Sequence, residues 1–259
     1  MTYRKLTFNP NIASQKPSNK DVCPFCDQTE LGKILDTKKD MIWVENKFPV
    51  LQDSYQTLII ESSWHDGDIS AYDLTVNRQL FAFMFEKWAV LEARNDYRSI
   101  VLFRNFGPLS GGSLRHPHSQ LVGFKDIDAY AALDKKTFAG LEIYKEAKDA
   151  TEISISSYPL QDFTEFNVRI ADISDLDRLA DSVQLLSDYV LNDFAGGRCS
   201  SYNLFFYRFE QEICCKVVPR FVTSAYNIAY GIHQVNQLKN LETTRDQVRT
   251  KFLERFKQS

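Results

Sequence analysis

Residues 103–124 read FRNFGPLSGGSLRHPHSQLVGF, and this stretch decides the fold. The segments at its ends, RSIVLFRNF (98–106) and HPHSQLVGF (116–124), are rich in β-branched and aromatic residues and predict two strands. The segment between them, GPLSGGSLR, is rich in glycine and serine and predicts a loop. We therefore expect two strands joined by a loop of small residues, with two histidines at the start of the second strand.

The sequence before this stretch predicts a first pair of strands and a helix. Residues 41–51 (MIWVENKFPVL) and 55–62 (YQTLIIES) are short, apolar and separated by a polar turn, which is typical of paired strands. Residues 68–96 predict an amphipathic helix, because apolar side chains recur at helical spacing. These side chains are Leu80, Phe81, Met84, Phe85, Trp88 and Leu91. Residues 1–20 are polar and predict an extended arm without a helix.

The same order recurs in the second part of the chain. Residues 152–160 and 165–172 predict strands, residues 175–197 predict a helix that ends at Gly196, and residues 200–209 and 212–221 predict two more strands. Residues 134–150 predict a charged helical or irregular stretch, and residues 232–256 predict a closing helix. The repeated order indicates an internal duplication in an α+β fold, with one half over 1–133 and the other over 134–259.

Composition restricts the classes of partner and location. A formal net charge of -3 with interspersed signs predicts no nucleic-acid partner. The sequence contains no apolar run long enough for a membrane span, and the N-terminus has no continuous apolar stretch. Five cysteines, two of them adjacent, fit poorly with a secreted disulfide framework. We therefore expect a cytoplasmic protein that does not bind membranes.

Cys23-Pro-Phe-Cys26 has the two-residue spacing that lets both thiols bind one zinc ion. A redox dithiol and two buried thiols without chemistry are the alternatives. A closed tetrahedral site needs two further ligands, and the chain has four histidines. We expect these ligands to be His65, after the strand over 55–62, and His116, at the start of the strand over 116–124. The alternative for each histidine is an ordinary polar surface position.

The motif HPHSQ (116–120) predicts a division of roles between its histidines. Side chains two apart on a strand share a face, so His116, His118 and Gln120 are expected to point the same way. If His116 binds metal, His118 stands next to it and is free to react. A neutral imidazole keeps one ring nitrogen with a lone pair that can attack phosphorus, which predicts a phosphohistidine-type intermediate.

Such a nucleophile needs a site that holds the phosphate. The loop before the motif offers backbone N–H groups, including those of Gly111 and Gly112, together with the Ser113 hydroxyl and the Gln120 amide. Arg104 or Arg115 could add positive charge. A glycine-rich hairpin entering an ordinary strand is the alternative interpretation.

Taken together, these motifs resemble the galactose-1-phosphate uridylyltransferase branch of the histidine-triad (HIT) superfamily. The similarity lies in CPFC, ENKFPVL, IIESSWH and FRNFGPLSGGSLRHPHSQLVGF, and weakly in YNLFFYR…VVPRF, and it extends over roughly residues 9–221. It implies an antiparallel sheet with flanking helices, built from two HIT-like halves. It also implies a structural zinc, a nucleophile that takes the nucleotidyl group, and residues that contact the nucleotide. The corresponding residues here are Cys23, Cys26, His65 and His116 for zinc; His118, with Gln120, for catalysis; and Asn105, Gly111, Gly112, Ser113 and Gln120 for the nucleotide.

The second half departs from that branch. EQEICCKVVPR stands where the branch carries a histidine-tryptophan-histidine element and an acidic residue, so this half is degenerate and galactose specificity does not follow. The resemblance implies a nucleotidyltransferase that acts on a nucleotide or nucleotide sugar and a phosphorylated acceptor by double displacement, and a possible homodimer. The alternatives are a phosphorylase or hydrolase of the same superfamily, and a nucleotide-binding protein without turnover.

Overall fold

The computed structural model describes residues 5–16, 23–145 and 151–256. These residues form two compact units, which are described separately. The first comprises Met1–Gly67, Ala82–Arg104 and Ser113–Ala132, and the second comprises Asp68–Phe81, Asn105–Gly112 and Leu133–Ser259. Among the described helices, none is both long enough and apolar enough to cross a membrane.

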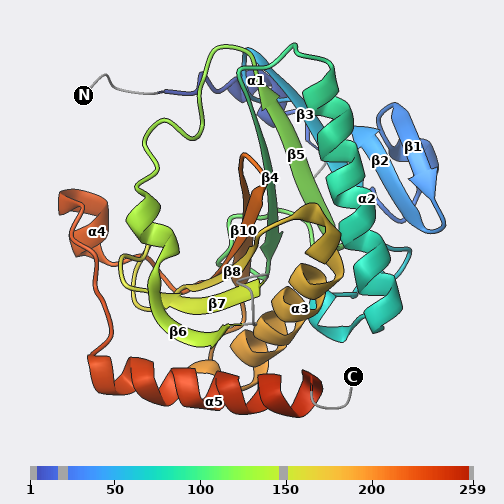
Figure 1. Cartoon of the computed structure of the whole chain (residues 1–259). Coiled ribbons are helices and arrows are strands. Elements are labelled where there is room, and N and C mark those ends of the chain that lie inside the picture. Colours follow the sequence, from blue (N-terminus) through green and yellow to red (C-terminus); the bar gives the residue numbers. More distant parts are fainter. Residues whose placement is uncertain (1–4, 17–22, 146–150, 257–259) are drawn as a thin grey trace. The chain divides into compact units, whose positions relative to one another are not determined.

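The first unit is built on antiparallel strands in the order β1-β2-β3-β5-β4 (Figure 1). Their bounds are β1 Ile34–Lys38, β2 Met41–Glu45, β3 Ser54–Ile60, β4 Ser99–Phe106 and β5 His118–Phe124. The register sets Ile60 opposite His118 and Leu58 opposite Gln120. It therefore places the HPHSQ motif in the middle of the sheet order, between β3 and β4.

Helix α2 (Leu74–Ala93) has its second half, from Ala82, in this unit. The six apolar side chains that predicted the helix are all buried, which confirms the 3.6-residue pattern. Lys87 of α2 lies over the rings of Trp43 and Phe83 and pairs with Asp36 of β1. Because the Trp43 indole N–H donates to Thr57 Oγ1, these contacts place α2 on the Trp43 and Thr57 face of the sheet. The short helix α1 (Pro10–Ala13) also belongs to this unit.

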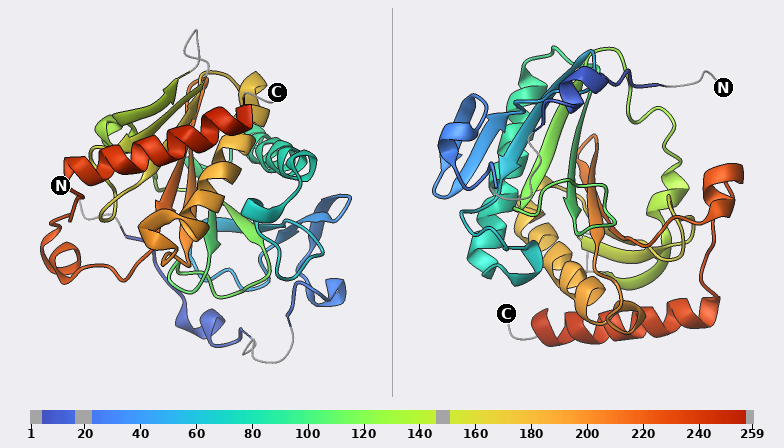
Figure 2. Two further views of the ribbon diagram at one scale, coloured as in Figure 1. Left: turned by 90° about the horizontal axis from the view of Figure 1, so that it is seen from below. Right: turned by 180° about the vertical axis from the view of Figure 1, so that it is seen from behind.

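The second unit repeats this design. Its antiparallel strands follow the order β9-β10-β8-β7-β6, with bounds β6 Gly140–Lys145, β7 Thr151–Ser156, β8 Phe166–Ile170, β9 Tyr202–Phe209 and β10 Glu212–Pro219. Helix α3 (Leu176–Asn192) packs on β8 and β10, and α5 (Leu238–Phe256) lies along α3, β6 and β7 (Figure 2). A short helix, α4 (Ala225–Tyr230), precedes α5. Short 3-10 helices complete the described elements at Gln28–Glu30, Ile69–Ala71, Lys135–Phe138, Ile173–Asp175 and Phe194–Gly196.

The two strand orders show the duplication directly. Numbered within its own half, each sheet runs first, second, third, fifth, fourth, and each helix (α2 or α3) connects the third strand to the fourth. The predicted α+β class and duplicated organisation are therefore confirmed. The predicted repeat lacked the first strand of each copy, because β1 is largely exposed and a register shift interrupts the two-residue period in both β1 and β6.

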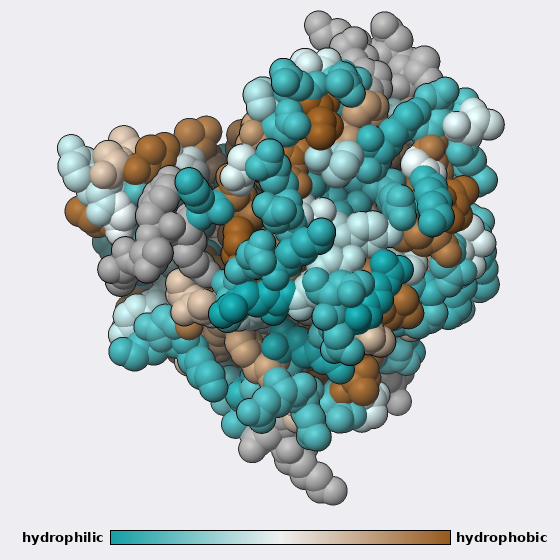
Figure 3. Space-filling model, turned by 90° about the horizontal axis from the view of Figure 1, so that it is seen from above, coloured by the Kyte–Doolittle hydropathy of each residue, from teal (hydrophilic) through white to brown (hydrophobic). Residues whose placement is uncertain are grey.

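Several predicted boundaries differ from the structure. Residues 140–145 of the stretch predicted to be helical or irregular form β6, and residues 146–150 lie outside the described part. The N-terminal arm contains α1, where Asn9 caps the helix and Pro10 begins it. Helix α5 begins at Leu238, not Ile232. The surface in Figure 3 is mainly hydrophilic, with hydrophobic residues in separate groups.

Candidate active site and metal centre

The first unit brings together the four predicted metal ligands. Cys23, Cys26, His65 and His116 each offer a ligand atom, and these atoms lie within 4.8 Å of one another. The Cys26 sulfur is 3.3 Å from His65 Nδ1 and 3.4 Å from His116 Nδ1, and the Cys23 sulfur is 3.7 Å from His116 Nδ1. Zinc bonds of 2.0–2.3 Å in a tetrahedron separate ligand atoms by about 3.3–3.8 Å. The cluster can therefore hold a metal ion of that size.

Neighbouring groups act on two ligands of this cluster. The other ring nitrogen of His116, Nε2, donates to the carbonyl of Ser62 at 2.8 Å, so Nδ1 is left with its lone pair toward the sulfurs. Burial and the adjacent Cys23 raise the pKa of Cys26, because the protein around the two sulfurs disfavours thiolates. A bound cation would oppose both effects. The chemistry of the donor set thus fits a thiolate-binding metal.

His118 begins β5 and is buried, with 6% of its surface exposed. Its Nδ1 lies 2.8 Å from the carbonyl oxygen of His116, which can only accept, so Nδ1 carries the proton and Nε2 carries the lone pair. Burial lowers the pKa of His118, which favours the neutral ring. The lowered pKa favours the neutral ring of His118, and the hydrogen bond to the His116 carbonyl favours the tautomer with the proton on Nδ1.

Alternate residues of β5 point to opposite faces of the sheet, and only one of these faces borders the pocket. His118 and Gln120 point into a pocket, whereas Ser119 points to the opposite side and donates to the carboxylate of Glu61 at 2.8 Å. Glu61 also accepts from Arg104, at 2.8 and 3.1 Å from Nε and 3.1 Å from Nη2, and both side chains are essentially fully buried. His116 precedes the strand and does not belong to it.

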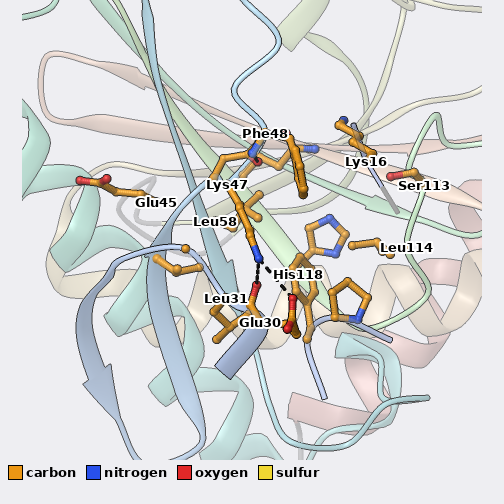
Figure 4. A pocket seen from close by; sticks show the side chains of 16 residues that line it. Lys16, Glu30, Leu31, Glu45, Lys47, Phe48, Leu58, Ser113, Leu114 and His118 are labelled. Atoms are coloured by element: carbon orange, nitrogen blue, oxygen red, sulfur yellow. Dashed lines mark hydrogen bonds and ion pairs between the residues drawn. The ribbon is translucent and has the colours of Figure 1, made fainter. Parts of the chain in front are cut away.

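Val44 and Leu58 line the pocket that contains His118 and alternate along β2 and β3 with Trp43 and Thr57, so the pocket lies on the face of the sheet away from α2. Figure 4 shows the side chains that line it. Its walls combine apolar and polar side chains, and Ser113 and Gln120 are among the polar ones. Phe25 of the CPFC knuckle packs edge-on against both His116 and His118, with ring centroids 5.9 and 5.2 Å apart. The metal cluster and the pocket therefore share a wall. The main apolar wall residues are Phe25, Leu31, Val44, Phe48, Leu58 and Leu114.

An ion pair lies on another side of this pocket. The Lys47 ammonium is 3.2 Å from both the carboxylate and the backbone carbonyl of Glu30, as Figure 4 shows. Of the two arginines considered as phosphate ligands, Arg104 is committed to Glu61 and Arg115 pairs with Asp66 at 2.7 Å. The hydrogen bond to Arg115 lowers the pKa of Asp66. The buried Arg104 is therefore not free to bind phosphate, whereas the exposed Arg115 uses only its Nε in the pair with Asp66.

The remaining predicted nucleotide contacts, Asn105, Gly111 and Gly112, belong to the second unit. The Asn105 side chain accepts from Asn203 Nδ2 at 2.6 Å. Gly111 has a φ of +84°, a left-handed conformation that favours glycine, and a Cβ there would meet nothing within 4 Å. Glycine is therefore favoured at position 111 by the backbone conformation, and not because a side chain would lack space there.

Sequence reasoning missed several residues that shape these sites. Phe25 carried a signal, since it stands inside CPFC, and Phe48 and Lys47 stand inside the quoted ENKFPVL segment. Glu61 stands inside the quoted IIESSWH segment, but no local pattern indicated its pairing, because its partners Arg104 and Ser119 are 43 and 58 residues away along the chain.

The chain matches two family models over most of its length. They are described as the N-terminal and C-terminal domains of a domain of unknown function, DUF4931, and match residues 8–127 and 130–253. The chain belongs to the DUF4931 family. A crystal structure of a DUF4931 family protein from Bacillus cereus is 40% identical with a TM-score of 0.77, covering 85% of this chain and 99% of that chain. No curated protein matches the chain.

More distant solved structures share the fold of this DUF4931 protein. An ADP-glucose phosphorylase from Arabidopsis thaliana with bound ADP-glucose is 15% identical, with a TM-score of 0.69 and coverage of 95% of this chain and 98% of that chain. A structure described as uridylyltransferase is 13% identical, with a TM-score of 0.68 and coverage of 91% and 92%. The resemblance to the uridylyltransferase branch is thereby confirmed at the level of fold.

Proposed function

We propose that this DUF4931 protein is a nucleotidyltransferase that works by double displacement through a nucleotidyl-His118 intermediate. The observation that carries the proposal is the hydrogen bond from His118 Nδ1 to the His116 carbonyl, which leaves Nε2 as the nucleophilic atom.

In the first step, the lone pair of Nε2 attacks the α-phosphorus of the nucleotide substrate. A P–N bond forms, the P–O bond to the leaving phosphate breaks, and the leaving oxygen keeps the electron pair. In the second step, a phosphate oxygen of the acceptor attacks the same phosphorus, the P–N bond breaks, and its electron pair returns to Nε2. Since the attacking oxygen is already an anion, the second step needs no general base.

The pocket beside His118 suits a nucleoside. Phe25, Phe48 and Leu58 offer apolar surface for a base, and Ser113 and Gln120 offer donors for phosphate oxygens. Structures of the same fold include an ADP-glucose phosphorylase and a uridylyltransferase, which supports a nucleotide or nucleotide sugar as substrate. Reduced thiols at Cys23 and Cys26 suit the cytoplasm.

We further propose zinc as the metal of the Cys23, Cys26, His65 and His116 cluster. Two sulfur and two nitrogen donors form a set that structural zinc sites use. No ligand position remains for water or substrate, so the ion would act by holding the CPFC knuckle against the HPHSQ strand. The proposed role is therefore structural.

The nucleotidyl-enzyme can be trapped directly. Incubation with nucleotides and nucleotide sugars labelled at the α-phosphate should give an acid-labile label on the wild-type protein, located at His118 by mass spectrometry. The variant His118→Ala should give none, whereas His233→Ala, which changes an exposed histidine of the second unit, should label normally.

Equal labelling of wild type and His118→Ala would refute the mechanism. Nucleotide binding that survives His118→Ala, without label on the wild type, would indicate a binding protein instead. Release of free nucleoside monophosphate in the absence of any acceptor would indicate a hydrolase.

A further inference from the structure

The pocket that contains His118 has an ion pair on its wall that the proposed phosphate chemistry does not use. The Lys47 ammonium donates to the carboxylate oxygen Oε2 of Glu30 and to the Glu30 backbone carbonyl, both at 3.2 Å. The two side chains are 48% and 62% exposed, and exposed ion pairs add little to the stability of a fold. Because both residues line the pocket, the pair is available to a ligand.

The backbone around this pair holds its two members next to each other. A Cβ at Gly32, two residues after Glu30, would lie 2.2 Å from the carbonyl oxygen of Glu45 and 3.4 Å from the backbone nitrogen of Lys47. Glycine thus permits the close approach of the two segments. The backbone nitrogen of Glu45 also donates to the carbonyl of Lys33 at 2.9 Å. The ion pair is therefore preorganised, and a ligand would not have to assemble it.

Apolar walls stand beside the pair and come from the same two segments. Leu31 and Phe48 directly follow Glu30 and Lys47 in the chain, and both line the pocket, as Phe25 does. Leu31 and Phe25 also pack on the buried apolar cluster of β2 and β3. A nucleobase has two apolar faces and a polar edge, so the walls suit its faces and the pair suits its edge.

The pair lies apart from the groups that are proposed to hold phosphate. Figure 4 shows Lys47 and Glu30 on one side of His118 and Ser113 on the other side. A nucleotide with its α-phosphorus at His118 would then direct its leaving phosphate toward Ser113 and its base toward the pair.

The donors and acceptors of the pair have a definite order. Lys47 has three N–H groups, of which two are used within the pair, so one remains for a ligand. The Glu30 carboxylate only accepts, and its Oε1 has no hydrogen bond to any other residue of the described part. A ligand therefore meets one donor followed by two acceptors. A base edge that matches this order must present one acceptor followed by two donors.

Of the four bases of RNA, only guanine presents this order. Its O6 accepts, and its N1–H and its 2-amino group donate. Uracil places the acceptor O2 where the second donor is needed, which would set two acceptors against each other. Adenine and cytosine each have a single amino group on this edge and no second donor beside it. Each of these three bases would leave one oxygen of Glu30 without a hydrogen bond.

We propose that the pocket selects a guanine nucleotide, with Lys47 donating to O6 and Glu30 accepting from N1 and the 2-amino group. This inference rests on the proposed function, because it takes the pocket beside His118 as the site of the nucleoside. The substrate class is a guanosine nucleotide or a sugar linked to guanosine diphosphate. Glu30 and Lys47 determine specificity and take no part in making or breaking bonds.

Base selection can be measured without turnover in the His118→Ala background. In calorimetry, GDP should bind at least about tenfold more tightly than ADP, UDP or CDP, because a hydrogen bond to a charged group contributes about tenfold to a hundredfold in affinity. Inosine 5′-diphosphate lacks only the 2-amino group of GDP and should bind about tenfold more weakly. Adding Glu30→Ala should reduce this difference to less than about twofold, which measures the coupling between the amino group and the carboxylate. Asp126→Ala, which changes an exposed acid of the same unit, should leave the difference unchanged.

Equal affinities for the four diphosphates would overturn the proposal. A Glu30→Ala variant that loses affinity equally for all four would place the pair on the ribose or a phosphate, and would overturn it as well. If Glu30→Ala does not fold by circular dichroism, Lys47→Met replaces it: this variant should weaken GDP and inosine 5′-diphosphate equally, because both carry O6, and should reduce the preference of GDP over ADP.

The base assignment and the nucleotidyltransferase fail separately. Preferential binding of GDP by a protein whose wild type is never labelled at His118 would refute the nucleotidyltransferase and leave the base assignment standing. Labelling of His118 by all four nucleotides with equal efficiency, without preferential binding of GDP, would do the reverse.

Discussion

Glu61 stabilises β5 through hydrogen bonds on the face of the sheet opposite the His118 pocket. Its carboxylate accepts from the buried Arg104 and from Ser119, the residue next to His118. Glu61→Gln would leave the Arg104 charge buried without its partner, and we expect a loss of about 3–5 kcal/mol in the free energy of unfolding. Urea denaturation measures it, with the exposed Glu210→Gln as control.

The paired substitution separates charge burial from packing. The double variant Glu61→Leu with Arg104→Leu removes both charges, so it should be less destabilised than Glu61→Gln alone. A double variant that is more destabilised than the single one would show that the pair contributes through geometry that leucine cannot replace.

His118 determines the expected pH dependence of labelling. Burial is the main cause that lowers its pKa below 6.5, against the opposing hydrogen bond to the His116 carbonyl. The reactive neutral ring is thus present above this lowered pKa and is lost as the pH falls through it. Single-turnover labelling from about pH 5 to 8 should have its acidic midpoint below 6.5. A midpoint at or above 6.5 would contradict the assignment.

At the scale of elements, α2 stabilises the first unit through one buried face. Trp88 is 1% exposed, and its indole N–H has no hydrogen-bond partner among the described residues. Trp88→Ala should cost about 3–5 kcal/mol of unfolding free energy, whereas Trp88→Phe, which removes the unpaired N–H and keeps an aromatic ring, should cost about 1–2 kcal/mol.

Val90 provides the control on the same helix. It is 41% exposed, so Val90→Ala should change the unfolding free energy by less than about 0.5 kcal/mol. Thermal or urea unfolding of the three variants tests the order, and equal losses for Val90→Ala and Trp88→Ala would mean that the buried face is assigned incorrectly.

At the scale of the whole molecule, the metal cluster ties together segments far apart in sequence. Cys26 and His116 are 90 residues apart, and Cys26 and His65 are 39 apart. Elemental analysis should find about one zinc per chain, and removal by a chelator should lower the melting temperature, since metal binding stabilises only the folded state.

Two cysteine variants test that expectation. Cys26→Ser should contain less zinc, and its melting temperature should not respond to the chelator. Cys199→Ser should behave as wild type, because Cys199 lies outside the cluster and a serine hydroxyl can replace its hydrogen bond to Ser201. If the wild-type protein loses all its zinc to the chelator and its melting temperature does not change, the metal has no structural role.

Much of the fold and of the candidate site could be predicted from local sequence patterns. The 3.6-residue spacing from Leu80 to Leu91 sufficed for α2, and the two-residue period of HPHSQ sufficed to put His118 and Gln120 on one face. Both signals arise because one face of the element is buried. The strands β1 and β6 were missed because β1 is mostly exposed and a register shift interrupts the two-residue period in both strands. The limits of the predicted halves, 1–133 and 134–259, stay a prediction.

The sequence by itself determined the fold class, the duplicated order of elements and the chemistry available: two thiols at zinc spacing, paired histidines and a glycine-rich loop. Only the tertiary structure decided which polar groups are paired. Arg104 is neutralised by Glu61, and Lys216 neutralises Glu165, whereas the Arg220 guanidinium donates to the side-chain oxygen of Asn203. Pairing depends on distances between residues many positions apart, which folding sets through the register of the strands and which no local pattern encodes.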